Sequence, residues 1–135
     1  MHPKFQEADE LSRRVIGAAI EVHRLKGPGL LESIYEKCLM HELCLQQIGA
    51  RNQVVVPIDY KGLVFDESLR LDVFVEDCLI VELKAVVQVL PIHKAQVLSY
   101  MKLMDVPLGL LINFHEMRLV AGVHRLILPG SGGNN

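Results

Sequence analysis

The chain has 135 residues, of which 50% are hydrophobic and 22% charged, so it can bury the core of one globular domain and is not a disordered chain. Its 14 Lys and Arg residues against 16 Asp and Glu residues give a formal net charge of −2. The overall charge therefore does not indicate nucleic-acid binding, and any phosphate-binding site has to be a local one.

The cysteine count and the apolar runs exclude two further classes. Three cysteines without CxxC spacing argue against a disulfide framework. No apolar run approaches the roughly 20 residues that span a bilayer. The first residues lack the apolar stretch of a secretory signal, so we expect a cytoplasmic protein with no membrane partner.

Two helices are predicted first. Apolar residues recur at steps of three and four over residues 7–25, with charged residues mostly between them, which predicts an amphipathic helix. Residues 27–29, a Gly-Pro-Gly segment, interrupt this pattern because they do not continue a helix without cost. A second helical pattern covers residues 31–48, and Gly49 is expected to stop it.

Three strands are predicted next. Residues 53–60 are rich in β-branched side chains, and Pro57 restricts this strand to a sheet edge or a bulge. Residues 70–75 and 79–84 are two short strands joined by the turn 76–78, which predicts a β-hairpin.

The C-terminal third contains one more helix and two strands. Residues 93–104 have helical spacing, 106–114 form an apolar run typical of a strand covered on both faces, and 119–128 predict a final strand. The order α-α-β-β-β-α-β-β predicts one mixed α/β domain over residues 1–128, followed by a flexible tail over 129–135.

The predicted hairpin carries charged residues in strands that are otherwise apolar. Side chains alternate across a strand, so Glu82 and Lys84 share one face. If the turn places Val75 opposite Leu79, each residue one step earlier in the first strand faces the residue one step later in the second. Asp72 then lies opposite Glu82 on the same face, with Cβ atoms about 5 Å apart. A shift in register by one residue would turn Asp72 to the other face.

Two carboxylates at that separation repel each other unless a positive charge lies between them. A hard divalent cation meets this need, and Mg²⁺ commonly binds one or two carboxylates together with water and substrate phosphate. Lys84 would add positive charge beside the same pocket, where it could orient a water or offset charge on a phosphate. The alternative is a solvated strand face with a cross-strand ion pair between glutamate and lysine, and the spacing alone leaves both open.

The charged residues of the hairpin resemble a known nuclease motif. Asp72, followed after nine residues by Glu82-Leu83-Lys84, is similar to the D-x(n)-E-x-K signature of the PD-(D/E)XK nuclease superfamily. Leu71 stands where the superfamily name implies a proline, whereas both carboxylates and the lysine are present.

A second motif resembles a narrower group. Residues 29–35 fit the Gly-x-x-Glu-x-x-Tyr pattern of the small bacterial proteins called the GxxExxY family. Further segments are similar to that family in order and spacing, namely residues 60–62, 81–85, 93–96 and 109–114. The resemblance covers residues 10–128, which is nearly the whole chain.

The resemblance implies a restriction-endonuclease-like core, a central mixed β-sheet flanked by helices, and metal-dependent hydrolysis of phosphodiester bonds in nucleic acid, in DNA more often than in RNA. The implied ligands of Mg²⁺ or Mn²⁺ are Asp72, Glu82, Glu32 and the backbone carbonyl of Leu83. The residues implied in catalysis are Asp72, Glu82, Lys84, Glu32 and Gln96. Lys84 would position the attacking water or stabilise charge, and Glu32 and Gln96 would support it.

Three further residues are candidates for substrate binding. Tyr100 shares a stripe of its helix with Gln96, and superfamily members often present a Gln or Tyr to the substrate phosphate from this helix. Tyr35 lies one turn after Glu32, and Lys94 could contact the nucleic-acid backbone. Structural alternatives stay open: the helix dipole for Glu32, core packing for Tyr35, and simple solvent exposure for Lys94 and the polar stripe.

Two other function classes also remain open. The acidic balance and the missing basic stripe are typical of a non-catalytic module that retains the nuclease fold and binds nucleic acid or protein. A homodimer or larger assembly, in which a partner supplies the basic surface, is the third interpretation, and a mean hydropathy of +0.28 is consistent with apolar contact surface.

Overall fold

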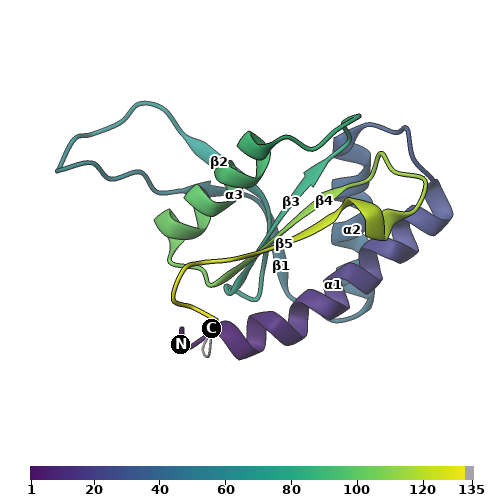
Figure 1. The fold of residues 1–135 in the computed structure, drawn as a ribbon, viewed down its shortest axis with the longest axis horizontal. Coiled ribbons are helices and arrows are strands. Elements are labelled where there is room, and N and C mark those ends of the chain that lie inside the picture. The colour runs from purple at the N-terminus through teal and green to yellow at the C-terminus, as the bar shows by residue number, and fades with distance from the viewer. Residues whose placement is uncertain (133–135) are drawn as a thin grey trace.

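A five-stranded sheet forms the centre of the molecule, with helices on both of its faces (Figure 1). The structure is a computed structural model and describes residues 1–132. The helices and strands are α1 (Phe5–Lys26), α2 (Glu32–Leu45), β1 (Ala50–Val56), β2 (Leu69–Val75), β3 (Leu79–Lys84), α3 (Pro91–Met104), β4 (Leu108–Asn113), the 3₁₀ turn η1 (Leu119–Gly122) and β5 (Val123–Ile127).

The strands follow one another across the sheet in chain order, β1-β2-β3-β4-β5. β3 and β4 are parallel, and the other neighbouring pairs are antiparallel. A parallel pair needs a crossover connection, and α3 provides it. The observed order and the mixed sheet confirm the expected α/β class and are consistent with a restriction-endonuclease-like fold.

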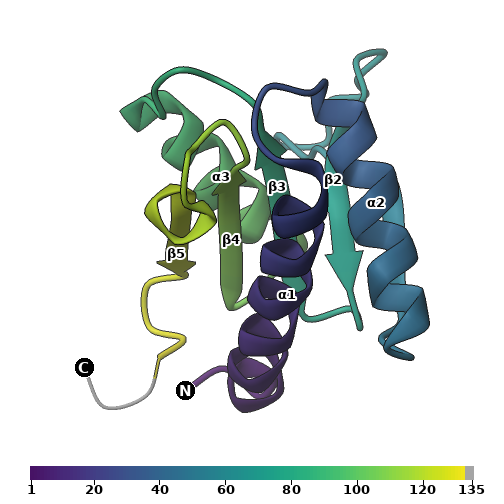
Figure 2. The ribbon, with the colours of Figure 1, turned by 90° about the vertical axis from the view of Figure 1, so that its right-hand side faces the viewer.

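Helices cover the two faces of the sheet with separate apolar cores. α1 and α2 pack on one face, where Val15, Leu39 and Val81 are fully buried (Figure 2). α3 packs on the other face, where Met101 contacts the core that contains Ile80. β4 lies between both layers and is buried along its whole length, as its continuous apolar sequence predicts.

The hairpin is the most accurately predicted part of the chain. β3 has the predicted bounds, and β2 begins one residue earlier than predicted. The strand predicted over 53–60 is partly wrong, because β1 begins at Ala50 and ends at Val56. Pro57 has no N–H to donate to a neighbour, so it ends the strand, and β1 lies at the sheet edge as this proline indicated.

Two other predicted elements differ from the observed ones by more than two residues at one end. The helix predicted to reach residue 48 ends at Leu45, because Gln47 adopts a left-handed φ of 59° and the N–H of Ile48 turns back to the Leu43 carbonyl at 2.9 Å. The segment predicted as one strand over 119–128 begins with η1, and only β5 pairs with β4.

The connection 57–68 between β1 and β2 projects from the body of the molecule (Figure 1). Tyr60 and Leu63 form an isolated bridge around a turn in which Lys61 and Gly62 both have positive φ. Val64 is 88% exposed, so this segment lies outside both cores.

The C-terminal segment returns to the N-terminus (Figure 1). Ser131 is buried, and its carbonyl accepts a hydrogen bond from the His2 N–H at 3.2 Å. Ser131 of the predicted tail therefore packs on the domain, whereas Pro129 and Gly130 are exposed, and residues 133–135 lie outside the described residues. No helix within residues 1–132 is both long enough and apolar enough to cross a membrane.

Tyr35 of α2 ties the loop before α2 to the core. Its ring is fully buried and stacks on Phe114, with ring centroids 4.4 Å apart. Its hydroxyl donates to the Gly27 carbonyl at 2.5 Å and accepts from the Leu30 N–H at 3.1 Å. These contacts fix the chain where α2 begins, one turn before Tyr35.

Tyr35→Phe should lower the free energy of unfolding by about 1–2 kcal/mol, because two backbone groups lose their partner while the stack on Phe114 remains. Chemical denaturation measures this difference. Tyr60→Phe is the matched control, since Tyr60 is 59% exposed and should tolerate the change. Equal unfolding free energies for the two variants would contradict the role given to the Tyr35 hydroxyl.

Candidate active site

Asp72 and Glu82 face each other across the β2–β3 hairpin. The strands pair with Val75 opposite Leu79 and Val73 opposite Val81, so the predicted register is confirmed. The next facing pair in this register is Asp72 and Glu82, which places the two carboxylates on neighbouring strands at the same level.

At this pair, hydrogen bonds from backbone N–H groups to side-chain carboxylates connect β2 and β3 in place of backbone–backbone bonds. The Asp72 N–H donates to Glu82 Oε1 at 2.9 Å, and the Leu83 N–H donates to Asp72 Oδ2 at 2.8 Å. Within residues 1–132, neither carboxylate accepts a further backbone N–H, and the two carboxyl groups lie within hydrogen-bonding reach of each other, which adds to the raised pKa of Glu82. One oxygen of each side chain is therefore held in place, and the second remains available to a ligand.

β2 is irregular at Asp72 on its other side as well. Gln53 of β1 lies at the level of Asp72 and has a positive φ of 50°, and this pair is missing from an otherwise continuous register. Leu71 packs in the core under α3, whereas Val73 packs in the core under α1 and α2. Regular alternation would point both to one face, so the strand is distorted where the carboxylate is placed.

Glu82 is the most buried charged residue of the site, with only 5% of its surface exposed. Burial, and then the nearby negative charge of Asp72, raise the pKa of Glu82 to about 9, and Lys84 offsets only a smaller part of this effect. The site therefore has an excess of negative charge, which either a proton or a cation can neutralise.

Lys84 and Glu32 lie within electrostatic reach of this pair. Lys84 is the last residue of β3 and is half-buried. Glu32 is the first residue of α2, and burial raises its pKa. The charge of Lys84 lowers that pKa, and the charge of Asp72 raises it, so α2 brings Glu32 to the same site.

α3 contributes Tyr100 and Gln96 from the opposite layer. Tyr100 is almost fully buried, and its pKa is raised by burial and then by the charges of Glu82 and Asp72. Gln96 is exposed and donates from Nε2 to the Tyr100 hydroxyl at 3.1 Å. The polar stripe expected on this helix thus runs from Tyr100, near the Asp72 and Glu82 carboxylates, to the exposed Gln96.

Two expected substrate-binding residues have other surroundings. Tyr35 is enclosed in the core, and its hydroxyl is used by the loop before α2. Lys94 lies near β5, because its charge contributes to the lowered pKa of His124. Their roles toward substrate stay predictions, and these contacts give them no support.

The donor set fits a hard divalent cation with few protein ligands. Asp72 and Glu82 each offer a second carboxylate oxygen, and Mg²⁺ is commonly bound by one or two carboxylates with water filling the other positions. Within residues 1–132, no group of three or more His, Cys, Asp or Glu side chains is placed to hold a metal. Glu32 therefore does not complete a three-carboxylate site in this structure.

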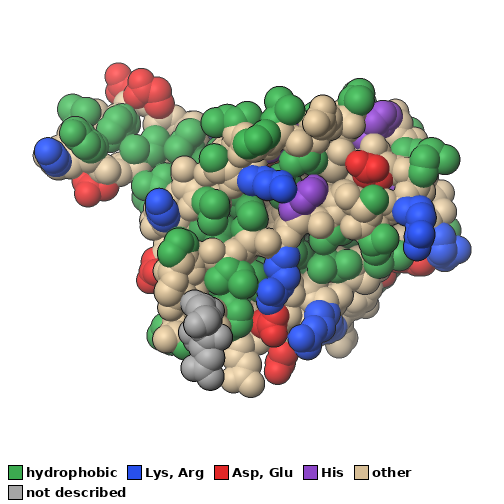
Figure 3. Space-filling view, in the orientation of Figure 1, with side chains coloured by type: hydrophobic (Ala, Val, Ile, Leu, Met, Phe, Trp, Pro, Cys, Tyr) green, Lys and Arg blue, Asp and Glu red, His purple; other side chains and the backbone are tan. Residues whose placement is uncertain are grey.

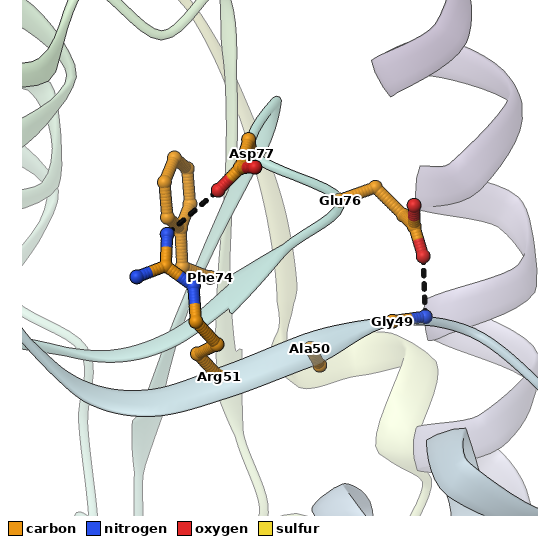
Figure 4. A pocket seen from close by; sticks show the side chains of 6 residues that line it. All are labelled: Gly49, Ala50, Arg51, Phe74, Glu76 and Asp77. Carbon is orange, nitrogen blue, oxygen red and sulfur yellow. Dashed lines mark hydrogen bonds and ion pairs between the residues drawn. The ribbon is translucent and has the colours of Figure 1, made fainter.

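A separate hollow of about 330 Å³ lies beside the turn of the hairpin, and the charged side chains that line it already have partners (Figure 4). It is lined by Gly49, Ala50, Arg51, Phe74, Glu76 and Asp77. Arg51 donates to Asp77 at 2.6 Å, and the Glu76 carboxylate accepts from the Gly49 N–H. These paired groups stabilise the hairpin turn. Because they satisfy one another, the hollow is not favoured as a reaction site.

Comparison with known proteins gives one match. The family model described as the PD-(D/E)XK nuclease superfamily matches residues 9–126, which include all of β1 to β4 and both carboxylates. No curated protein and no solved structure matches the chain.

The raised pKa of Glu82 predicts a pH-dependent stability in the absence of divalent ions. The folded state binds this proton more tightly than the unfolded chain, whose glutamate has the ordinary value of 4.5. The stabilisation is complete below pH 4.5 and is lost as the pH rises toward about 9. Relative to Glu82→Gln, the wild type should lose up to about 1 kcal/mol per pH unit across this window.

Chemical denaturation in EDTA at several pH values measures this loss. Glu10→Gln on the exposed side of α1 is the control and should follow the wild-type pH profile. Parallel profiles for the wild type and Glu82→Gln would show that the buried carboxylate does not titrate in this window.

Proposed function

Since the chain belongs to the PD-(D/E)XK nuclease superfamily, we propose that it is a metal-dependent nuclease that hydrolyses phosphodiester bonds of nucleic acid, with DNA as the favoured substrate. The observation that carries the proposal is the pairing of Asp72 with Glu82 across the hairpin, with Lys84 two residues further along β3. The motif matched in the sequence thus corresponds to adjacent groups in the fold.

Asp72 and Glu82 would hold Mg²⁺ or Mn²⁺ through their second oxygens. The backbone carbonyl of Leu83 is proposed as a further ligand, and Glu32 as one that acts through water, since it does not complete a three-carboxylate site. A bound divalent ion would supply the positive charge that polarises a phosphate and lowers the pKa of a bound water. The raised pKa of Glu82 means that its charged form lacks compensation here, and a cation that displaces its proton would supply that compensation, which supports cation binding at this position.

The remaining polar residues would act on water and phosphate. Lys84 would orient the attacking water or stabilise the negative charge that develops on the phosphate. Gln96 and Tyr100 would donate hydrogen bonds to a phosphate that enters beside α3. Lys94 would contact the nucleic-acid backbone beyond the cleaved bond. Tyr35 has no place in this mechanism, because its hydroxyl is already paired.

Within the superfamily, we propose that the chain belongs to the GxxExxY group of bacterial proteins. The motif at residues 29–35 has a physical basis in this fold, which supports the assignment. Tyr35 fixes the loop that starts α2, and Glu32 at the first position of that helix lies near Lys84 and Asp72. The three-residue spacing of the motif thus places Tyr35, which anchors the loop, one helical turn after Glu32, which lies near the candidate site.

The charge of the surface favours a second candidate function. Lys and Arg side chains on the face in Figure 3 are spread over it, with two side by side at the right edge, and form no continuous basic stripe. With a net charge of −2, the chain has little general affinity for a duplex. This favours, as the alternative, a binding module without catalysis or a subunit of a homodimer or larger assembly whose partner supplies basic surface.

Cleavage tests the catalytic proposal directly. Glu82→Ala and Lys84→Ala should each reduce Mg²⁺-dependent cleavage of labelled single- and double-stranded oligonucleotides by about 10²-fold or more. Glu67→Ala and Lys102→Ala are the controls, since both residues are exposed and lie outside the site. Circular dichroism confirms folding, and full activity in both site variants would exclude this mechanism.

Metal binding tests the pocket without relying on cleavage. Isothermal titration of Mg²⁺ and Mn²⁺ should give binding to the wild type and a much weaker signal for Asp72→Asn, because the substitution removes one of the two charges that attract the ion. Asp66→Asn, in the projecting connection, should bind as the wild type does. Unchanged affinity in Asp72→Asn would contradict the proposed pocket, and binding without any cleavage would favour the non-catalytic module.

A further inference from the structure

We propose that Asn113 is a positioning residue that fixes Lys84 in the orientation needed for reaction. The inference rests on the proposed nuclease function and adds a residue to it. Asn113 lies in the segment 109–114 that resembles the GxxExxY family, and that resemblance implies no role for it. Its surroundings in the fold supply that role.

Asn113 binds the chain that follows Lys84 with its side-chain amide. It is the last residue of β4 and is fully buried. Its Oδ1 accepts hydrogen bonds from the Val86 N–H at 3.0 Å and the His115 N–H at 3.2 Å. Its Nδ2 donates to the Val86 carbonyl at 2.9 Å. The amide thus pairs with both polar backbone groups of Val86, as a neighbouring strand would.

These bonds hold the end of β3 at the position of Lys84. Lys84 and Asn113 are the last facing pair of the parallel β3–β4 ladder, and the Phe114 N–H donates to the Lys84 carbonyl at 2.8 Å. Val86 is then clamped by Asn113, and Val87 beyond it is 87% exposed. The clamp is therefore the last attachment to β4 before the chain leaves the sheet toward α3.

Lys84 depends on this attachment because its own side chain is weakly restrained. Within residues 1–132, Lys84 makes no ion pair and its amine forms no hydrogen bond to another residue. The direction of a long, flexible side chain is then set mainly by the position of its backbone. A catalytic group displaced by about 1 Å can lose about 10²-fold in rate.

An amide is the side chain that suits this position. The other five residues of β4 are apolar or glycine, and a buried polar group needs partners to offset its desolvation. A leucine at position 113 would leave both backbone groups of Val86 unpaired, and an ionised aspartate could not donate to the Val86 carbonyl.

A double-mutant cycle with Lys84 tests the inference in the Mg²⁺-dependent cleavage assay. Asn113→Ala should lower kcat by about tenfold to 10²-fold, with little change in KM or in Mg²⁺ affinity measured by titration. In the Lys84→Ala background, Asn113→Ala should cost little more, because the residue through which it acts is already absent. Leu108→Ala, a buried change at the other end of β4, is the control for general destabilisation and should add to Lys84→Ala.

A milder variant keeps the test valid if Asn113→Ala folds poorly. Asn113→Asp retains the acceptor for the N–H groups of Val86 and His115 and loses only the donor, so its loss of kcat should be smaller. Additive losses in the cycle, or a kcat equal to that of Leu108→Ala, would overturn this inference alone. A wild type with neither Mg²⁺ binding nor cleavage would overturn the proposed function together with it.

Discussion

The exchange of backbone N–H groups and carboxylates between Asp72 and Glu82 is the interaction on which the site depends. Each carboxylate accepts one N–H from the facing strand, so the two acids are held close together despite their repulsion. Glu82 is also only 5% exposed, so a negative charge on it would be poorly solvated. The fold thus makes the ionised form of Glu82 costly, and a divalent cation at the pair would offset that cost.

The surrounding elements complete this arrangement from three directions. α2 contributes Glu32, and its first turn is held by the buried Tyr35. α3 lies on the opposite layer and contributes Tyr100 beside the carboxylates. β4 secures the end of β3 through Asn113. Each element combines a core residue that fixes its position with a polar residue near the hairpin, so packing and site geometry depend on one another.

The polar groups of the candidate site and the surface cations are distributed differently in this molecule. The polar groups near the hairpin are concentrated and partly buried, whereas the cations on the face in Figure 3 form no continuous stripe. A nuclease with this surface would rely on local contacts to one phosphate, or on a second chain, more than on long-range attraction to a duplex. The apolar, acidic connection 57–68 projects without adding basic surface, since its one lysine is accompanied by Asp59, Asp66 and Glu67.

The sequence by itself determined the order of the elements, the bounds of β3, the hairpin register and the pairing of Asp72 with Glu82. These features depend on short-range rules: the period of the apolar pattern, the length of a turn and the alternation of side chains along a strand. Only the tertiary structure decided that β1 spans Ala50–Val56, that Tyr35 is enclosed in the core and that Asn113 clamps Val86. The stack of Tyr35 on Phe114 and the bonds of Asn113 join segments far apart in the chain, and no local pattern records which distant backbone group a side chain will meet.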